Sequence, residues 1–180
     1  VYAFNSEPVQ PPLLAFVGRI SPEKGPVEAI KIARATGLPL KMAGKIDVVD
    51  KDFYTEQVEP LIDGEQIQFL GEVSHEEKVK LLSEASVTLF PINWREPFGL
   101  VMIESMATGT PVVAMGLGSV PEVIAHDKTG YVCHSLEAMI EMVPYAMKLD
   151  RHTCREYVVN RFSVESMASE YERAYSMVMV

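Results

Sequence analysis

Two glutamates, Glu96 and Glu104, flank the start of a predicted helix. Residues 100–107 are helix formers with one apolar face, so Gly99 is predicted near the first turn and Glu96 in the loop before it. Because helical side chains tilt toward the N-terminus, the Glu104 carboxylate is expected to lean back over that turn. Free N–H groups at a helix start suit a phosphate, and a carboxylate beside a phosphate suits sugar hydroxyls. The segment predicts a sugar-phosphate site, the alternative being two ordinary surface glutamates.

Two cations, Arg19 and Lys24, lie in a loop that Gly18 and Gly25 bracket. The loop follows a short apolar run, and its glycines allow the backbone to turn tightly and approach a ligand closely. A forked contact from Arg and a point charge from Lys are an expected way to hold a diphosphate. The alternative is a solvated surface loop.

Several other classes of site are disfavoured by the same segments. The loop after Gly18 lacks both the G-x-G-x-x-G pattern of dinucleotide-binding proteins and the G-K-[ST] ending of a P-loop. The triplet 50–52 matches an acidic D-x-D metal motif, but we interpret it as the start of a helix, with capping as the role of the acidic residues. We therefore predict no metal ligands.

Composition indicates one globular domain. The chain has 180 residues, 48% hydrophobic and 23% charged, which is enough to bury a sizeable core, and no apolar run is long enough to span a membrane. A net charge of −9 without a basic stripe argues against nucleic acid as a partner. Cys133 and Cys154 form no C-x-x-C motif, and the four histidines are scattered, so neither a disulfide framework nor a zinc site is predicted. Free thiols favour a cytoplasmic location.

Apolar strands alternate with amphipathic helices along the chain. Strands are predicted at 13–17, 40–43, 67–70, 86–90, 111–114 and 130–132, and helices at about 27–35, 52–62, 75–85, 100–107, 135–148, 151–160 and 163–178. This alternation predicts an α/β fold, a Rossmann-like doubly wound parallel sheet in a single domain over 13–180. Residues 1–12 are rich in Pro and polar groups and are predicted to be a linker-like segment. The two loops with candidate chemistry should share the carboxyl edge of the sheet.

These segments together resemble a known family. The matching runs are Phe16–Gly25, Phe69–Gly71, Glu96–Glu104, Gly109–Ala114, Pro121–Ile124 and Thr129–Tyr131. In order and content they look like the C-terminal half of a retaining GT-B glycosyltransferase, of the group 1 (family 4) type with an E-x7-E motif. The resemblance extends from about residue 13 to 175. One difference is that Ser119 stands where the family often has a second glycine before Pro-Glu.

The resemblance implies roles for individual residues. Arg19, Lys24 and Glu96 would form the catalytic set, with the two cations on the donor diphosphate and Glu96 positioning the donor sugar. Glu104 would bind the ribose hydroxyls, and Val73 would contact the nucleobase. The other donor-binding residues implied are Gly18, Phe98, Gly99 and Leu100.

The implied activity is transfer of a hexosyl-type sugar from a nucleotide-diphosphate sugar, with retention and without a metal or other cofactor. The acceptor, a sugar, lipid-linked sugar or small molecule, would be recognised mainly by an N-terminal domain absent from this sequence. That domain would also make any peripheral membrane contact, and the 180 residues alone would not transfer sugar at a useful rate. Two other functions remain open: a non-catalytic nucleotide-sugar-binding or scaffold domain of the same fold, and a glycoside hydrolase using Glu96 and Glu104, which explains neither Arg19 nor Lys24.

Overall fold

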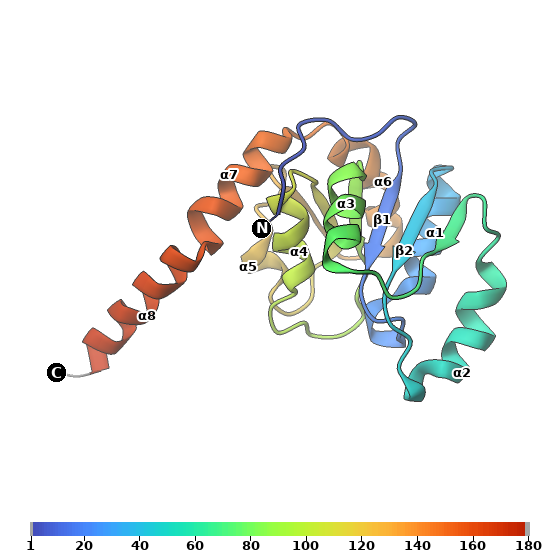
Figure 1. The fold of residues 1–180 in the computed structure, drawn as a ribbon, viewed down its shortest axis with the longest axis horizontal. Coiled ribbons are helices and arrows are strands. Elements are labelled where there is room, and N and C mark those ends of the chain that lie inside the picture. Colours follow the sequence, from blue (N-terminus) through green and yellow to red (C-terminus); the bar gives the residue numbers. More distant parts are fainter. Residues whose placement is uncertain (1, 179–180) are drawn as a thin grey trace.

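A single sheet of six parallel strands forms the centre of the computed structural model, which describes residues 2–178 (Figure 1). The strands are β1 (Leu14–Val17), β2 (Leu40–Ala43), β3 (Ile67–Phe69), β4 (Val87–Phe90), β5 (Val112–Met115) and β6 (Gly130–Cys133). Their order across the sheet is β3-β2-β1-β4-β5-β6, with every neighbouring pair parallel. The predicted α/β doubly wound fold is confirmed.

Helices follow the strands where the sequence pattern predicts them, and one short helix, at 120–123, was not predicted. The main ones are α1 (Pro26–Thr36), α3 (His75–Glu84), α4 (Leu100–Ala107), α5 (Val120–Val123), α6 (Leu136–Ala146), α7 (Arg151–Phe162) and α8 (Val164–Val178). The start of α3 has a capping box, in which Ser74 accepts from the Glu77 N–H and Glu77 accepts from the Ser74 N–H.

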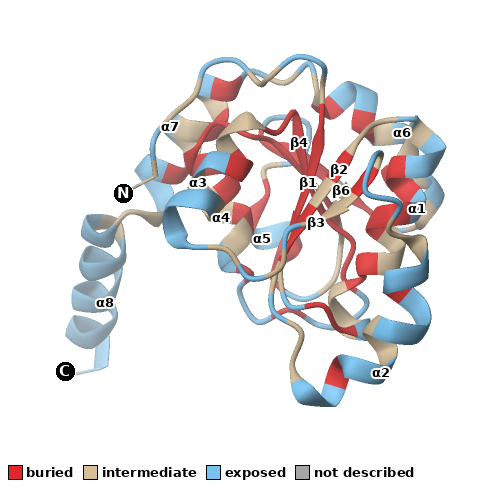
Figure 2. Cartoon of the chain, turned by 45° about the vertical axis from the view of Figure 1, so that its right-hand side comes forward, coloured by how far each residue is buried: buried red, intermediate tan, exposed pale blue. Residues whose placement is uncertain are grey.

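Two helical layers bury both faces of the sheet. Helices α1 and α6 cover one face, where Leu14, Phe16 and Leu89 contribute to the largest apolar cluster. On the other face, α4 and α7 pack around Met102 and Met106, and α3 packs over a smaller cluster. Figure 2 shows β1 and β4 in red at the centre of the sheet, and β5 is also buried except at its last residue. Burial on both faces explains why the strands are continuous apolar runs rather than alternating ones.

The predicted helix at 52–62 is helical but irregular. It consists of short turns, namely η2 (Val48–Asp50), α2 (Lys51–Phe53), the π-helical η3 (Tyr54–Val58) and η4 (Glu59–Leu61). Pro60 lacks the N–H that a continuing α-helix needs, which accounts for the tight last turn. A helical segment does begin at the acidic triplet, but the Asp50 side chain makes no capping hydrogen bond, so the predicted capping role is wrong.

The segment predicted to be linker-like packs on the domain. Residues 2–12 contain no helix or strand, yet Asn5 N–H donates to Thr108 O and Val9 N–H to Glu84 O. Arg151, which is 6% exposed, donates to Asn5 O and also to Ala85 O. Burial of this guanidinium lowers its pKa to about 10. The N-terminal segment is thus held against the layer formed by α3, α4 and α7.

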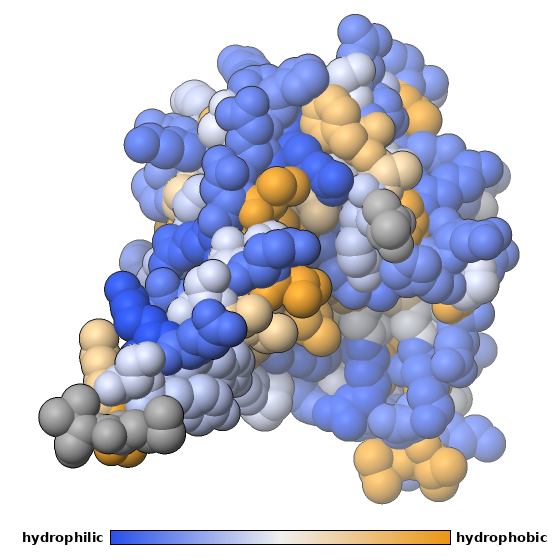
Figure 3. Space-filling model, turned by 60° about the vertical axis from the view of Figure 1, so that its left-hand side comes forward, coloured by the Kyte–Doolittle hydropathy of each residue, from blue (hydrophilic) through white to orange (hydrophobic). Residues whose placement is uncertain are grey.

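The last helix, α8, has no buried residue and extends away from the sheet (Figures 1 and 2). Val164, Met167, Tyr171 and Tyr175 lie on it at helical spacing and are more than half exposed. Figure 3 views the molecule from this side, where orange apolar and blue hydrophilic side chains are interspersed. Among residues 2–178, no helix has the length and apolar character needed to cross a membrane.

Candidate functional site

The strand order reverses between β1 and β4, and a small cavity lies at the carboxyl ends of these two strands. Ligands of open α/β sheets bind at such switch points, because the loops diverge there and leave a crevice. The cavity has a volume of about 160 Å³. It is lined by Val17, Gly18, Lys24, Phe90, Glu96, Gly99, Leu100 and Val101. The structure therefore brings together five of the predicted site residues: Gly18, Lys24, Glu96, Gly99 and Leu100.

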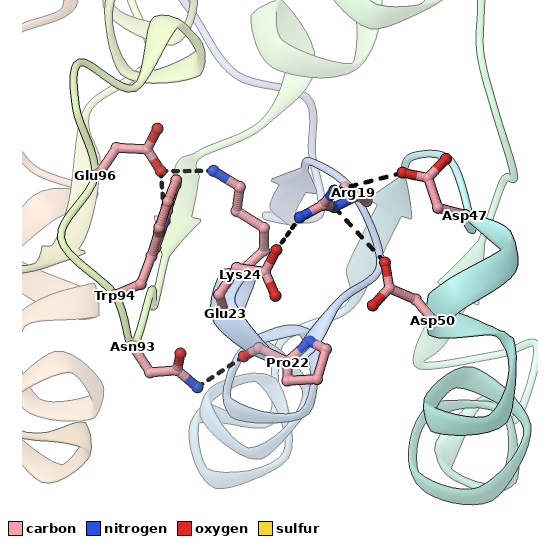
Figure 4. A network of polar contacts seen from close by, with 9 residues as sticks. All are labelled: Arg19, Pro22, Glu23, Lys24, Asp47, Asp50, Asn93, Trp94 and Glu96. Carbon is pink, nitrogen blue, oxygen red and sulfur yellow. Dashed lines mark hydrogen bonds and ion pairs between the residues drawn. The ribbon is translucent and has the colours of Figure 1, made fainter.

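Lys24 and Glu96 form an ion pair inside this crevice (Figure 4). Lys24 Nζ lies 2.5 Å from Glu96 Oε2, and the exposed fractions of the two side chains are 20% and 10%. Trp94 Nε1 donates to the same oxygen at 2.8 Å, and Lys24 Nζ lies 4.8 Å from the centre of the Trp94 ring. Glu96 Oε2 thus accepts hydrogen bonds from both a cation and an indole N–H.

The loop after β4 is fastened to the loop after β1. Asn93 N–H donates to Glu23 O at 3.0 Å, and Asn93 Nδ2 donates to Pro22 O at 2.7 Å. These bonds fix the turn that carries Lys24 relative to the loop that carries Glu96. The ion pair is therefore held by backbone contacts as well as by its own charge.

The loop after β5 supports the other side of Glu96. Ser119 N–H donates to Glu96 O, and Ser119 Oγ donates to Phe98 O, both at 2.9 Å. Gly118 has a φ of 62° and lies so close to the backbone of Glu96 that a Cβ added at Gly118 would collide with it. The serine that replaces the family's second glycine thus gains a hydrogen bond to the site loop.

Helix α4 begins beside Glu96. Its N-cap, Gly99, has a φ of 77°, a left-handed conformation that lets the chain turn from the loop directly into the helix. The first N–H groups of a helix have no partner within it, and the N-terminus carries partial positive charge. Both features lie at the same end of the sheet as Lys24, so this edge carries several groups that favour an anion.

Arg19 does not line the cavity. Its guanidinium faces three carboxylates, Glu23, Asp47 and Asp50, with Nη1 3.5 Å from Asp47 Oδ2 and Nε 3.7 Å from Asp50 Oδ2 (Figure 4). The side chain is 42% exposed. Lys45 and Arg19 lower the pKa of Asp47, with the Lys45 hydrogen bond as the largest cause.

Within residues 2–178, no set of three or more His, Cys, Asp or Glu side chains is arranged to hold a metal ion.

Glu104 also does not line the cavity. Its Oε1 accepts hydrogen bonds from the Tyr2 hydroxyl and from Lys78 Nζ, the latter at 2.8 Å. The carboxylate is therefore directed to α3 and the N-terminal segment, and its side chain is 16% exposed. Burial, followed by the bond to Glu104, raises the pKa of the Tyr2 phenol.

The remaining two predicted residues lie outside the cavity. Val73 is half-buried against an apolar cluster formed by β1, β2 and α3. Phe98 is 41% exposed and borders an adjoining hollow of about 500 Å³, which Glu96 and Phe162 of α7 also line. A hollow of about 630 Å³ lies between α7 and α8, and none of the predicted site residues lines it.

Sequence reasoning missed the partners of the predicted residues. Trp94, the only tryptophan of the chain, lies two residues before Glu96, and that proximity was an available signal. Tyr2 and Lys78 are 102 and 26 residues from Glu104, so no local pattern could have connected them. The same holds for Asp47, which is 28 residues from Arg19.

Comparison with known proteins identifies the family. An uncharacterized glycosyltransferase of Methanocaldococcus jannaschii is 30% identical over 179 residues, covering 93% of this chain and 45% of that protein. AviGT4, a glycosyltransferase involved in avilamycin A biosynthesis, is 25% identical with a TM-score of 0.78, covering 98% of this chain and 52% of its own. HepE of Anabaena, solved with UDP and with UDP-glucose, shares the fold at 20% identity in its UDP complex, with a TM-score of 0.80, covering 92% of this chain and 49% of its own.

The chain thus spans about half the length of the curated relatives it matches. Residues 3–160 match the family described as glycosyl transferases group 1. That match covers most of the chain and all six strands, with the cavity at the carboxyl edge of the sheet inside it. The chain belongs to the group 1 glycosyltransferase family.

Proposed function

We propose that this chain is the donor-binding domain of a retaining glycosyltransferase that uses a nucleotide-diphosphate sugar of hexosyl type. The observation that carries the proposal is the cavity between β1 and β4, where Lys24, Glu96 and the start of α4 converge. Lys24 and the helix N–H groups suit a phosphate, and the Glu96 carboxylate suits sugar hydroxyls.

Lys24 would stabilise the diphosphate as it leaves, together with the N-terminus of α4. A fixed cation and preorganised N–H groups stabilise developing negative charge without reorganising solvent. Arg19 would join them once the diphosphate competes with the carboxylates that now hold its guanidinium. Because these cations replace a divalent ion, donor binding would be independent of metal.

Glu96 would position the sugar rather than attack it. Its carboxylate accepts hydrogen bonds in the structure, and we assign it the same role toward the sugar hydroxyls. Retention would then arise from attack by the acceptor on the face that the diphosphate leaves. Glu104 would hold the ribose after its own partners, Tyr2 and Lys78, make room.

The uridine nucleotides bound by HepE make UDP the first donor nucleotide to test. An acceptor site would be supplied by a further, N-terminal domain of a longer protein, since this chain spans about half of its relatives. Donor and acceptor must be held in reacting geometry away from water, which a closing two-domain cleft provides.

The test is calorimetric titration of the chain with UDP, GDP and ADP, and with UDP-glucose, GDP-mannose and ADP-glucose. We expect one nucleotide to bind and Lys24→Met to weaken it about tenfold to a hundredfold, the scale of losing a hydrogen bond to a charged group. Lys31→Met, an exposed lysine on α1, is the matched control. No binding of any nucleotide, or equal affinity of the two variants, would refute the assignment.

Catalysis is tested on a longer protein that includes the N-terminal half. Transfer from the preferred nucleotide sugar to an acceptor mixture by the longer protein, and not by these 180 residues, is the expected result. Binding without turnover by the longer protein would favour the non-catalytic alternative. Comparable turnover by both would show that the additional half is dispensable.

A further inference from the structure

Trp94 is the side chain of the site to which the proposed function assigns no role. We propose that Trp94 is a positioning residue, whose indole N–H holds one oxygen of Glu96 while Lys24 exchanges from Glu96 to the donor diphosphate. The inference rests on the proposed function, because it assigns the sugar to Glu96 and the phosphates to Lys24. The inference adds Trp94, a residue to which the proposed function gives no contact with the sugar or with the phosphates.

The two oxygens of the Glu96 carboxylate have different surroundings. Lys24 Nζ and Trp94 Nε1 both bond Oε2, at 2.5 and 2.8 Å. No hydrogen bond to Oε1 is made by the residues that the structure describes, and in Figure 4 this oxygen points away from both donors. One oxygen is therefore anchored, and the other is available to accept from a ligand hydroxyl.

Lys24 has two competing anions in the presence of a donor. In the structure its charge is matched by Glu96, which is 9% exposed. A diphosphate beside Gly18 and α4 carries more negative charge than a carboxylate, so it would draw the ammonium away from Glu96. A nearly buried carboxylate that loses its cation needs a hydrogen-bond donor that stays in place, because water reaches the carboxylate poorly.

Trp94 can supply that donor without disturbing the exchange. The indole N–H donates and cannot accept, and it carries no charge that would compete with Lys24 for phosphate. The ring also contacts Lys24 Nζ, 4.8 Å from its centre, so the exchange moves the ammonium away from the ring. An arginine or lysine at this position would itself bind the phosphates, and a phenylalanine would leave Oε2 without a donor.

The loop geometry fits a fixed support rather than a mobile one. Neighbouring Asn93 is bonded through both its backbone and its side chain to the turn before Lys24. On the other side, the Glu96 carbonyl accepts from Ser119 N–H. The backbone of Trp94 is thus held between two bonded positions, which restricts where its N–H can point.

The test compares Trp94→Phe with wild type for a nucleoside diphosphate and for its sugar conjugate, by calorimetry. Loss of the N–H should weaken binding of the conjugate about tenfold, equivalent to about 1.4 kcal/mol, and weaken the nucleoside diphosphate much less. Tyr145→Phe, which changes a half-exposed ring on α6, is the control and should alter neither affinity. Equal losses for the two ligands, or no loss for either, would overturn the positioning role.

The exchange of Lys24 has its own readout, because Trp94 is the only tryptophan in the chain. Departure of the ammonium from the ring should change the tryptophan emission as nucleoside diphosphate is added. The emission change should give the same dissociation constant as calorimetry. Calorimetric binding without an emission change would contradict the exchange. If wild type binds no nucleotide at all, the proposed function itself fails; if it binds and Trp94→Phe matches it for both ligands, only the positioning role fails.

Discussion

Replacing Gly118 by alanine tests whether the loop after β5 fixes the position of Glu96. Gly118 has a φ of 62°, and a Cβ added there would lie 2.5 Å from Glu96 N and 2.9 Å from Arg95 C. The left-handed conformation costs an alanine about 1–2 kcal/mol. Overpacking against backbone, which cannot rotate away, adds about 1–3 kcal/mol. The free energy of unfolding should therefore fall by about 2–5 kcal/mol.

Gly64→Ala separates the two contributions. Gly64 has a φ of 76°, and an added Cβ there meets nothing within 4 Å. The free energy of unfolding of this variant should fall by about 1–2 kcal/mol, because of the left-handed conformation alone. The effect of alanine on the unfolded chain is similar at both positions and largely cancels in the difference.

Urea unfolding at unchanged m-value gives both free energies, and calorimetry gives the affinity for the nucleotide sugar. Gly118→Ala should lose about 1–3 kcal/mol more stability than Gly64→Ala, and it alone should bind the sugar conjugate more weakly. Equal destabilisation by the two variants would show that this loop does not hold Glu96 in place. So would a Gly118→Ala protein that binds the conjugate as wild type does.

Four further predictions concern the ribose contact, metal dependence, alkaline stability and a helix cap. Glu104→Ala should weaken calorimetric binding of the preferred nucleoside diphosphate by about 1–3 kcal/mol, whereas Glu141→Ala, on the exposed side of α6, should not; equal affinities would exclude the ribose role. Titrations in EDTA and in magnesium should give the same nucleotide affinity, and a large loss on chelation would reopen the acidic triplet at 50–52 as a metal site. The Asp127 hydrogen bond raises the pKa of Tyr131 from 10.0 to about 12, so the folded state holds this proton more tightly than the unfolded chain does. The free energy of unfolding measured in urea should therefore fall as the pH rises from about 10 toward 12. A Tyr131→Phe protein with the same pH slope would contradict this. Ser74→Ala should cost about 0.5–2 kcal/mol in urea unfolding through loss of the α3 cap, and an unchanged midpoint would show the cap to be dispensable.

Regular elements were predictable because their signals are local. Apolar runs closed by glycine indicate strands buried on both faces, and β2 and α4 have the bounds that the sequence predicts. The capping box of α3 is likewise formed by residues three apart. The segment 48–61 was harder, because Pro60 and a π-helical turn interrupt its periodicity.

The candidate site was predictable only in part. Lys24, Glu96 and Gly99 converge because parallel strands end at one edge, and this topology follows from the alternation of elements. The direction of the Arg19 and Glu104 side chains depends on distant residues such as Asp47 and Tyr2, which no local pattern reveals. Long-range ion pairs are set by the folded geometry rather than by spacing in the chain.

The proposed donor site lies at the switch point between β1 and β4. A crystal structure of the chain with UDP-glucose, or with whichever conjugate calorimetry selects, tests this most directly. We predict density for the diphosphate beside Lys24 and the N-terminus of α4, with the sugar within hydrogen-bond reach of Glu96. A conjugate bound instead in the hollow between α7 and α8, with the switch-point cavity unchanged, would contradict the proposed donor site.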